Sequence, residues 1–265
     1  MSRIQHVLDK AEREGALRRT KPVDDHMGHG VLVDRLPPQL DTDVLVEPPD
    51  TVVVATTTLE AHMVVGRIPA GAVAEQYRAL RTRILHGDRG AAAQVLLVTS
   101  PGRNEGRSLT VANLALAMAQ IRQRRVCVLD ADLRAPRQHQ LFGLSDRPGL
   151  SDVLLMRAPL ENALVSITEH DISVLPAGPT PPHPAELLGT TAMRRVLHAL
   201  RSRFDHVIVD APAAAPLADI GILAPLVDRI VLVVRAGTTS KPAIHEAIAA
   251  IEPSKLLGFV LNDRV

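Results

Sequence analysis

The sequence predicts an α/β fold in which a mostly parallel sheet is covered by helices on both faces. From residue 94 onward, short apolar runs alternate with helical stretches, as in sheets whose strands are buried on both sides. The first run leads through a Gly-containing loop into a long helix. Acidic residues directly follow two runs, at the edge where α/β sheets bind their ligands. Aromatic residues make up only 2% of the chain, so Ala, Val, Leu and Ile must form the core.

The N-terminal part of the chain is expected to lie outside this sheet. Residues 2–19 carry apolar side chains at helical spacing, which predicts a short amphipathic helix. Residues 20–60 contain scattered prolines and little periodicity, which is typical of a flexible linker. We therefore divide the chain into an N-terminal helix and Pro-rich linker, 1–60, and a folded domain, 61–265.

A strong helix is predicted over residues 73–86. Glu75, Arg78 and Arg81 recur at every third position and so lie on adjacent turns of one helix face. Two interpretations remain open from the pattern alone. The three side chains form a solvated, salt-bridged face, or they form a contact in which Glu of one subunit meets Arg of another.

Six apolar runs of three to five residues are the expected strands. The single cysteine, Cys127, lies in one of them and cannot form an internal disulfide, which fits a reducing compartment. Runs of this kind separated by helices favour a parallel sheet. The predicted strands are Val95–Val98, Val126–Leu129, Ile172–Leu175, Val207–Val209, Ile230–Val234 and Leu257–Leu261.

The loop after the first strand has most features of a phosphate-binding P-loop. Residues 101–108 read Pro-Gly-Arg-Asn-Glu-Gly-Arg-Ser and lead into an amphipathic helix. The pattern G-x-x-x-x-G-K-[ST] has Gly in place of Pro101 and Lys in place of Arg107. Ser108 keeps the hydroxyl that holds Mg²⁺, and Arg107 keeps a positive charge with forked donors suited to phosphate. Backbone N–H groups at such a helix start bind anions.

Three aspartates follow predicted strands. Asp130 and Asp132 come after the second strand, and Asp210 comes directly after the fourth. A buried carboxylate is costly unless it is paired or metal-bound. In P-loop proteins, an acid in this position holds Mg²⁺ directly or through water. The three aspartates therefore predict a magnesium site beside the loop.

These residues together predict phosphoryl transfer or NTP hydrolysis. The loop N–H groups and Arg107 would neutralise the β- and γ-phosphates, while Ser108 and the aspartates would position Mg²⁺. Asp130 or Asp132 would orient or deprotonate the attacking hydroxyl or water.

Over about residues 70–265, the chain resembles the bacterial tyrosine kinases (BY-kinases) of polysaccharide synthesis. SPGRNEGRSLTVANLALA is similar to the Walker A motif of that family, VLDADLRAPRQHQLFG to its Walker A′ motif and IVDAPAAAPLAD to its Walker B motif. LPAGPTPPHPAELLG and the terminal GFVLND also resemble family segments. EQYRALR is similar to the E-x-x-R-x-x-R motif, which mediates ring oligomers in the family.

The resemblance implies a P-loop NTPase fold with ATP or ADP and Mg²⁺ as cofactors. It implies catalytic roles for Asp130, Asp132 and Arg107, and metal binding near Ser108, Asp130 and Asp210. The nucleotide contacts that it implies are Gly102, Arg103, Asn104, Glu105, Gly106, Arg107, Ser108, Leu109 and Asn262.

The resemblance also implies partners and a location. Glu75, Arg78 and Arg81 would lie at the interface of a homo-oligomeric ring. The expected partner is a membrane chain-length determinant, or co-polymerase, which would hold a cytoplasmic protein at the inner membrane. No apolar run reaches the length of a membrane span, and we expect no signal peptide. A formal net charge of +1 gives no electrostatic reason to expect nucleic-acid binding.

Three functions remain open. The first is an ATP-binding, Mg²⁺-dependent kinase that regulates exopolysaccharide polymerisation or export. The second is a non-catalytic pseudokinase scaffold, which Arg107 favours; the family's C-terminal tyrosine cluster is also missing before Val265, and the single tyrosine, Tyr77, is expected to be structural. The third is a ParA/MinD-type positioning ATPase, which normally has Lys in place of Gly102.

Overall fold

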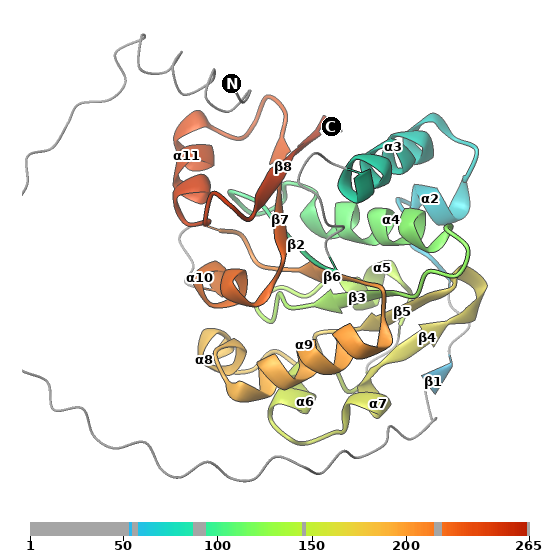
Figure 1. Ribbon diagram of the computed structural model, residues 1–265, viewed down its shortest axis with the longest axis vertical. Coiled ribbons are helices and arrows are strands. Elements are labelled where there is room, and N and C mark those ends of the chain that lie inside the picture. The colour runs from blue at the N-terminus through green and yellow to red at the C-terminus, as the bar shows by residue number, and fades with distance from the viewer. Residues whose placement is uncertain (1–52, 55–57, 87–93, 145–146, 215–218, 264–265) are drawn as a thin grey trace, which may run out of the picture. The chain divides into compact units, whose positions relative to one another are not determined.

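In the computed structural model, the described residues (53–54, 58–86, 94–144, 147–214 and 219–263) build an eight-stranded sheet. Its strand order is β1-β4-β5-β3-β6-β2-β7-β8 (Figure 1). Every neighbouring pair is parallel except β4 and β5, which are antiparallel. The strands are β1 (Val53–Val54), β2 (Val95–Thr99), β3 (Val126–Asp130), β4 (Val165–Ile167), β5 (Ile172–Leu175), β6 (His206–Asp210), β7 (Arg229–Arg235) and β8 (Leu256–Asn262).

All six predicted strands are confirmed, and two short strands were missed. β1 falls inside the segment predicted as linker, and Leu59 in the same segment is buried in the core. The predicted helix over residues 2–19 lies outside the described residues. The boundary at residue 60 stays a prediction, and all described residues belong to one compact unit, Glu47–Val265.

Helices cover both faces of the sheet, as the sequence predicted. α2, α3 and α4 lie on one face, and α6 to α9 lie on the other (Figure 1). No helix among the described residues has the length and apolarity needed to cross a membrane. The helices are α2 (Val64–Arg67), α3 (Ala72–His86), α4 (Arg107–Ala119), α5 (Gln138–Leu141), α6 (Leu150–Leu154), α7 (Leu160–Ala163), α8 (Pro184–Leu188), α9 (Thr191–Arg203), α10 (Asp219–Leu223) and α11 (Lys241–Ala249), with 3-10 turns η1 (Thr168–His170) and η2 (Ala224–Leu226).

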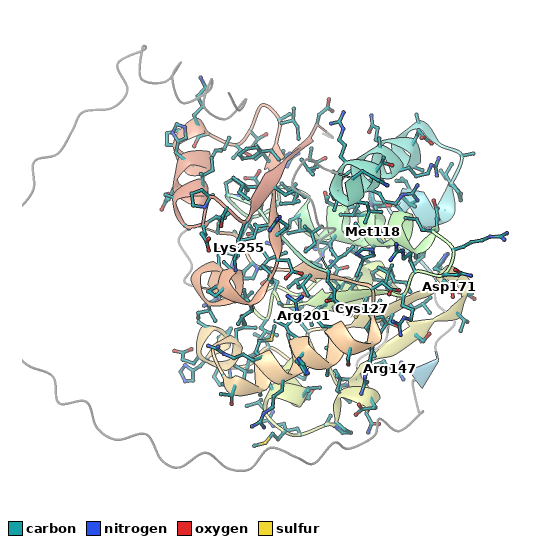
Figure 2. All side chains as sticks on the ribbon, viewed as in Figure 1. Met118, Cys127, Arg147, Asp171, Arg201 and Lys255 are labelled. Atoms are coloured by element: carbon teal, nitrogen blue, oxygen red, sulfur yellow. The ribbon has the colours of Figure 1, made fainter. Side chains whose placement is uncertain are left out.

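The sheet separates two apolar layers, and the strands alternate between them. Val95 and Leu97 of β2 belong to the layer under α6 to α11, whereas Leu96 and Val98 belong to the layer under α2 to α4. Cys127, the second residue of β3 (Figure 2), is buried, and burial raises the pKa of its thiol. A strand that is apolar at every position is therefore explained by burial on both faces.

α4 differs from the amphipathic helix that was predicted. Only Ser108, Leu109 and Ala119 along it are partly exposed; the rest of the helix is buried. One side packs on the sheet and the other under α2 and α3. Asn113 of α4 holds α2 in place. Its Oδ1 accepts from the N–H of Val65 at 3.0 Å, and its Nδ2 donates to the carbonyl oxygen of His62 at 3.2 Å.

The register of the central strands brings the site residues to one level. β6 lies between β2 and β3, and Asp130 of β3 is paired in register with Asp210 of β6. Val98 of β2 is paired with the same Asp210 on its other side. The loop after β2 therefore begins beside the two acidic strand ends.

Candidate nucleotide site

The loop after β2 has a backbone shape suited to anions. Asn104 and Gly106 both have positive φ values, 61° and 85°. Gly106 is the N-cap of α4, and the first N–H groups of a helix lack intrahelical partners. A Cβ at position 106 would lie 2.1 Å from Nδ2 of Asn262, so a larger residue would displace the Asn262 side chain as well as strain the backbone. The N–H groups at this helix start can therefore bind a phosphate.

The loop is fastened to the ends of β7 and β8. The buried Glu105 carboxylate accepts hydrogen bonds from the N–H of Arg235 at 2.6 Å and from the hydroxyl of Thr239. Nδ2 of Asn262 donates to the carbonyl oxygen of Glu105 at 2.9 Å. The Glu105 contacts were not predicted, because Arg235 and Thr239 belong to no recognised motif. The contact of Asn262 with a nucleotide stays a prediction.

Arg107 joins the acidic ends of two strands. Its Nε lies 2.6 Å from Oδ1 of Asp210, and its Nη2 lies 2.5 Å from Oδ2 of Asp132. All three side chains are buried. Burial lowers the pKa of the Arg107 guanidinium, but the charges and hydrogen bonds of Asp210 and Asp132 outweigh burial and raise the pKa above its ordinary value. Arg107 is thus a buried cation between two carboxylates, and its contact with phosphates stays a prediction.

Asp130 lies behind this cluster with no exposed surface. One carboxylate oxygen accepts from the N–H of Asp132 at 3.2 Å. The other accepts from the N–H groups of Arg137 at 3.1 Å and Gln138 at 3.0 Å. Burial, and next the negative charge of Asp210, raise the pKa of the Asp130 carboxyl well above its usual value, against the backbone hydrogen bonds. Asp130 therefore holds the shape of the loop that follows β3.

Gln138, at the start of α5, contacts all three residues that were predicted to hold Mg²⁺. Its Nε2 donates to Oδ2 of Asp210 at 2.7 Å and to the carbonyl oxygen of Ser108 at 3.0 Å, and its N–H binds Asp130. Its Oε1 is buried without a hydrogen-bond partner among the described residues. Gln138 was not predicted as a site residue, because a glutamine eight residues after Asp130 matches no metal-binding pattern.

A further ion pair ties the acidic loop to α10. Nε of Arg134 lies 3.1 Å from Oδ2 of Asp219, and Nη2 of Arg134 lies 3.4 Å from Oδ1. Asp219 is fully buried and begins α10. The loop after β3 is therefore fixed to the helix that follows β6.

Two adjoining cavities meet at the loop. The first has a volume of about 560 Å³, and its walls include Asp132 and Arg134 and the predicted nucleotide contacts Arg103 to Leu109. The second has a volume of about 810 Å³ and is lined in part by apolar side chains. Asn104 and Gly106 line both cavities, and Asn262 lines the second. Of the two acids after β3, Asp132 borders the first cavity and Asp130 does not line it.

The oxygen atoms at this site fit a hydrated Mg²⁺ ion. Mg²⁺ prefers oxygen ligands and keeps several waters; Ser108 offers a hydroxyl and Asp210 a carboxylate, whereas both Asp130 oxygens already accept backbone N–H groups, so metal binding by Asp130 stays a prediction. The buried Oε1 of Gln138 is an acceptor still available for a water. Among the residues that the structure describes, no three His, Cys, Asp or Glu side chains are grouped as metal ligands.

The predicted interface residues lie on α3, where all three contact their own chain. Nε of Arg78 lies 2.8 Å from Oε2 of Glu75, and Nη1 of Arg78 donates to the carbonyl oxygen of Pro69 at 2.8 Å. Nη1 of Arg81 donates to the carbonyl oxygen of Ala117 at 2.6 Å and so ties α3 to α4. The intersubunit contact stays a prediction.

Solved structures share this fold. The CapA2B2 chimera aligns with a TM-score of 0.72 and 30% identity, covering 79% of this chain and 93% of the chimera. The kinase domain of the Escherichia coli tyrosine kinase ETK aligns with a TM-score of 0.71 and 28% identity, covering 76% and 79%. A Mg-ADP complex of MinD from Pyrococcus horikoshii, at 23% identity and a TM-score of 0.52, shows likeness of fold alone.

Curated relatives agree with these structures. No family model matches the chain. Tyrosine-protein kinase YwqD of Bacillus subtilis is 37% identical over 198 residues, which are 74% of this chain and 83% of YwqD. The chain spans only 27% of the E. coli tyrosine-protein kinase etk, at 30% identity. The identity to YwqD and the coverage of both chains confirm the predicted family: this chain belongs to the bacterial tyrosine-protein kinases.

Proposed function

We propose that the chain binds ATP with Mg²⁺ and transfers the γ-phosphoryl group to a tyrosine of a separate polypeptide. The observation that carries this proposal is the P-loop-like turn before α4, which borders the same cavity as Asp132 and Arg107. The apolar walls of the second cavity suit a nucleoside base. Relatives named as tyrosine-protein kinases support the choice of tyrosine as acceptor.

In this proposal each group has a separate task. The N–H groups at the start of α4 bind the phosphates, and Arg107 at the cavity wall supplies positive charge. Ser108, Asp130 and Asp210 would hold Mg²⁺, which neutralises phosphate charge when it is bound. Asp132 accepts the proton of the attacking hydroxyl, because it borders the cavity whereas Asp130 lies behind it.

The proposed setting is exopolysaccharide or capsule production. We infer that the chain works at the cytoplasmic side of the membrane, with a membrane chain-length determinant as partner. Relatives of the capsule type, including the CapA2B2 chimera, support this setting. Ring assembly through Glu75, Arg78 and Arg81 belongs to the same proposal, and its test is the mass of the protein in solution with and without ATP.

One observation favours a second candidate, a nucleotide-binding scaffold without transfer activity. Arg107 replaces the P-loop lysine and is engaged with Asp132 and Asp210. In a scaffold, the same cluster would hold the fold together and nucleotide binding would control assembly only.

Calorimetry with ATP and ADP, with and without Mg²⁺, tests binding; transfer of labelled phosphate to a tyrosine-containing polymer tests catalysis. A positioned base contributes about 10²–10⁴-fold, so Asp132→Asn should lower transfer at least 100-fold. The matched control Asp171→Asn changes an exposed aspartate outside the first cavity and should leave transfer unchanged. Binding without transfer would support the scaffold, and no binding under any condition would refute both candidates.

A further inference from the structure

Gln138 has a position that the predicted catalytic groups do not explain. It is fully buried and touches P-loop, β3 and β6 residues at once, through Ser108, Asp130 and Asp210. Three of its four polar groups are satisfied, since its carbonyl oxygen accepts from the N–H of Phe142. The fourth, Oε1, is buried and lacks a hydrogen-bond partner among the described residues.

The orientation of the Gln138 amide is fixed by its partners. A carbonyl oxygen and a carboxylate oxygen are acceptors only, and both contact the same end of the amide, at 3.0 Å from Ser108 and 2.7 Å from Asp210. That end must therefore be the NH₂ group. A flipped amide would set its oxygen against both acceptors, so the unpaired atom is the oxygen.

A buried acceptor without a donor destabilises the fold by about 1–3 kcal/mol. Such groups in proteins are commonly satisfied by ordered water or by a ligand. The two acceptors that Nε2 contacts, the Asp210 carboxylate and the Ser108 carbonyl oxygen, have no proton to donate to Oε1. A bound water can supply that donor, and a water bound to a cation is a strong donor.

We propose that Gln138 is a positioning residue for the divalent cation of the nucleotide site. Its Oε1 accepts a hydrogen bond from a water ligand of that cation, while its Nε2 holds the Asp210 carboxylate in orientation. The proposal rests on the proposed nucleotide function. It adds a residue outside the P-loop and the strand-end aspartates. It predicts that Gln138 changes the affinity for the cation and not the affinity for the nucleotide phosphates.

The test uses Mn²⁺ as the probe cation and ADP as the nucleotide. The affinity of Mn²⁺ for the protein–ADP complex is measured by electron paramagnetic resonance on the parent protein and on Gln138→Met. Loss of an outer-shell partner typically weakens metal binding 10–100-fold. We expect a loss in that range in Gln138→Met, with ADP affinity in EDTA changed less than about twofold.

The matched control is Gln140→Met, because Gln140 lies in the same helix with an exposed side chain. It should bind Mn²⁺ like the parent. Gln138→Asn keeps the amide but shortens the side chain, and it replaces Gln138→Met if that variant does not fold. Gln138→Asn should also weaken Mn²⁺ binding to the protein–ADP complex.

The outcomes separate this proposal from the proposed function. If the parent binds no nucleotide, the proposed function fails and the Gln138 proposal fails with it. If the parent binds ADP and Mn²⁺ but Gln138→Met binds Mn²⁺ equally well, only the Gln138 proposal is refuted. Equal losses of ADP affinity with and without metal would also refute it, because they would show a purely structural role.

Discussion

Replacing Arg107 by methionine should destabilise the protein much more than the same replacement at the exposed Arg103. Methionine keeps most of the side-chain volume but removes the only cation that contacts both Asp132 and Asp210 in the described structure. Two carboxylates would then remain buried beside the buried Asp130 without a counter-ion. The cost therefore comes from unpaired charge and not from lost packing.

The magnitude follows from the burial of the pair. Removing one partner of a buried ion pair costs about 3–5 kcal/mol, and for a domain of this size each kcal/mol shifts the melting temperature by about 2–4 °C. Arg107→Met should therefore melt about 6–20 °C below the parent in metal-free buffer. Mg²⁺ should recover part of this loss, because it offers a cation to the same carboxylates.

The assay is thermal and urea denaturation at pH 7 with EDTA and then with Mg²⁺. Arg103→Met is the matched control, since Arg103 is exposed in the same loop. It should change stability by no more than about 0.5 kcal/mol. If Arg107→Met melted within two degrees of Arg103→Met, Arg107 would not be the counter-ion of this cluster, and the electrostatic account of the site would be wrong.

Three further substitutions test the surroundings of the site. Glu105→Ala removes the acceptor of the Thr239 hydroxyl and the shorter of the two acceptors of the Arg235 N–H, and it should lower the free energy of unfolding by about 1–3 kcal/mol in urea denaturation. Burial raises the pKa of Asp228, but hydrogen bonds and charge from Arg201 outweigh it and hold the pKa below its usual value. That stabilisation is present above the unfolded pKa of about 3.9 and is lost as pH falls through the folded pKa. Asp228→Asn should therefore cost about 1 kcal/mol at pH 7, and the difference from the parent should shrink below about pH 4. In Gly149→Ala, the new Cβ would lie 2.1 Å from a backbone nitrogen, so the melting temperature should fall by an amount equivalent to about 1–3 kcal/mol, whereas Gly221→Ala meets nothing within 4 Å and should be neutral.

The strands that carry the site were predictable because burial on both faces leaves an unbroken apolar run. Val126–Leu129 and Val207–Val209 show this clearly, and the acids that follow them were located from the same runs. β4 has only three residues and β1 only two, so neither is long enough to show a pattern. The antiparallel pairing of β4 with β5 depends on contacts between distant residues and leaves no signature in sequence.

The individual side-chain contacts of the site were less predictable. Motif spacing placed Arg107, Asp132 and Asp210 in one region, but it did not indicate that the guanidinium lies between the two carboxylates. Gln138 and Glu105 were not singled out for their actual contacts, because these contacts join segments far apart along the chain. A sequence motif indicates which residues face a ligand. It does not indicate which hydrogen bonds and ion pairs those residues make within the protein.

The use of arginine in place of lysine has a structural reason in this chain. The two contacts of Arg107 come from different nitrogens and reach carboxylates that follow different strands, Asp132 after β3 and Asp210 at the end of β6. A lysine ammonium is a compact point charge on one flexible stem, whereas a guanidinium presents several donors in a rigid fork. Arg107 therefore ties the phosphate loop to β3 and β6 at the same time. Gln138 reinforces the tie from the other side, since it binds the second oxygen of Asp210. The acidic centre is thus held together by the chain's own donors, and a divalent cation that binds there must share the carboxylates with Arg107.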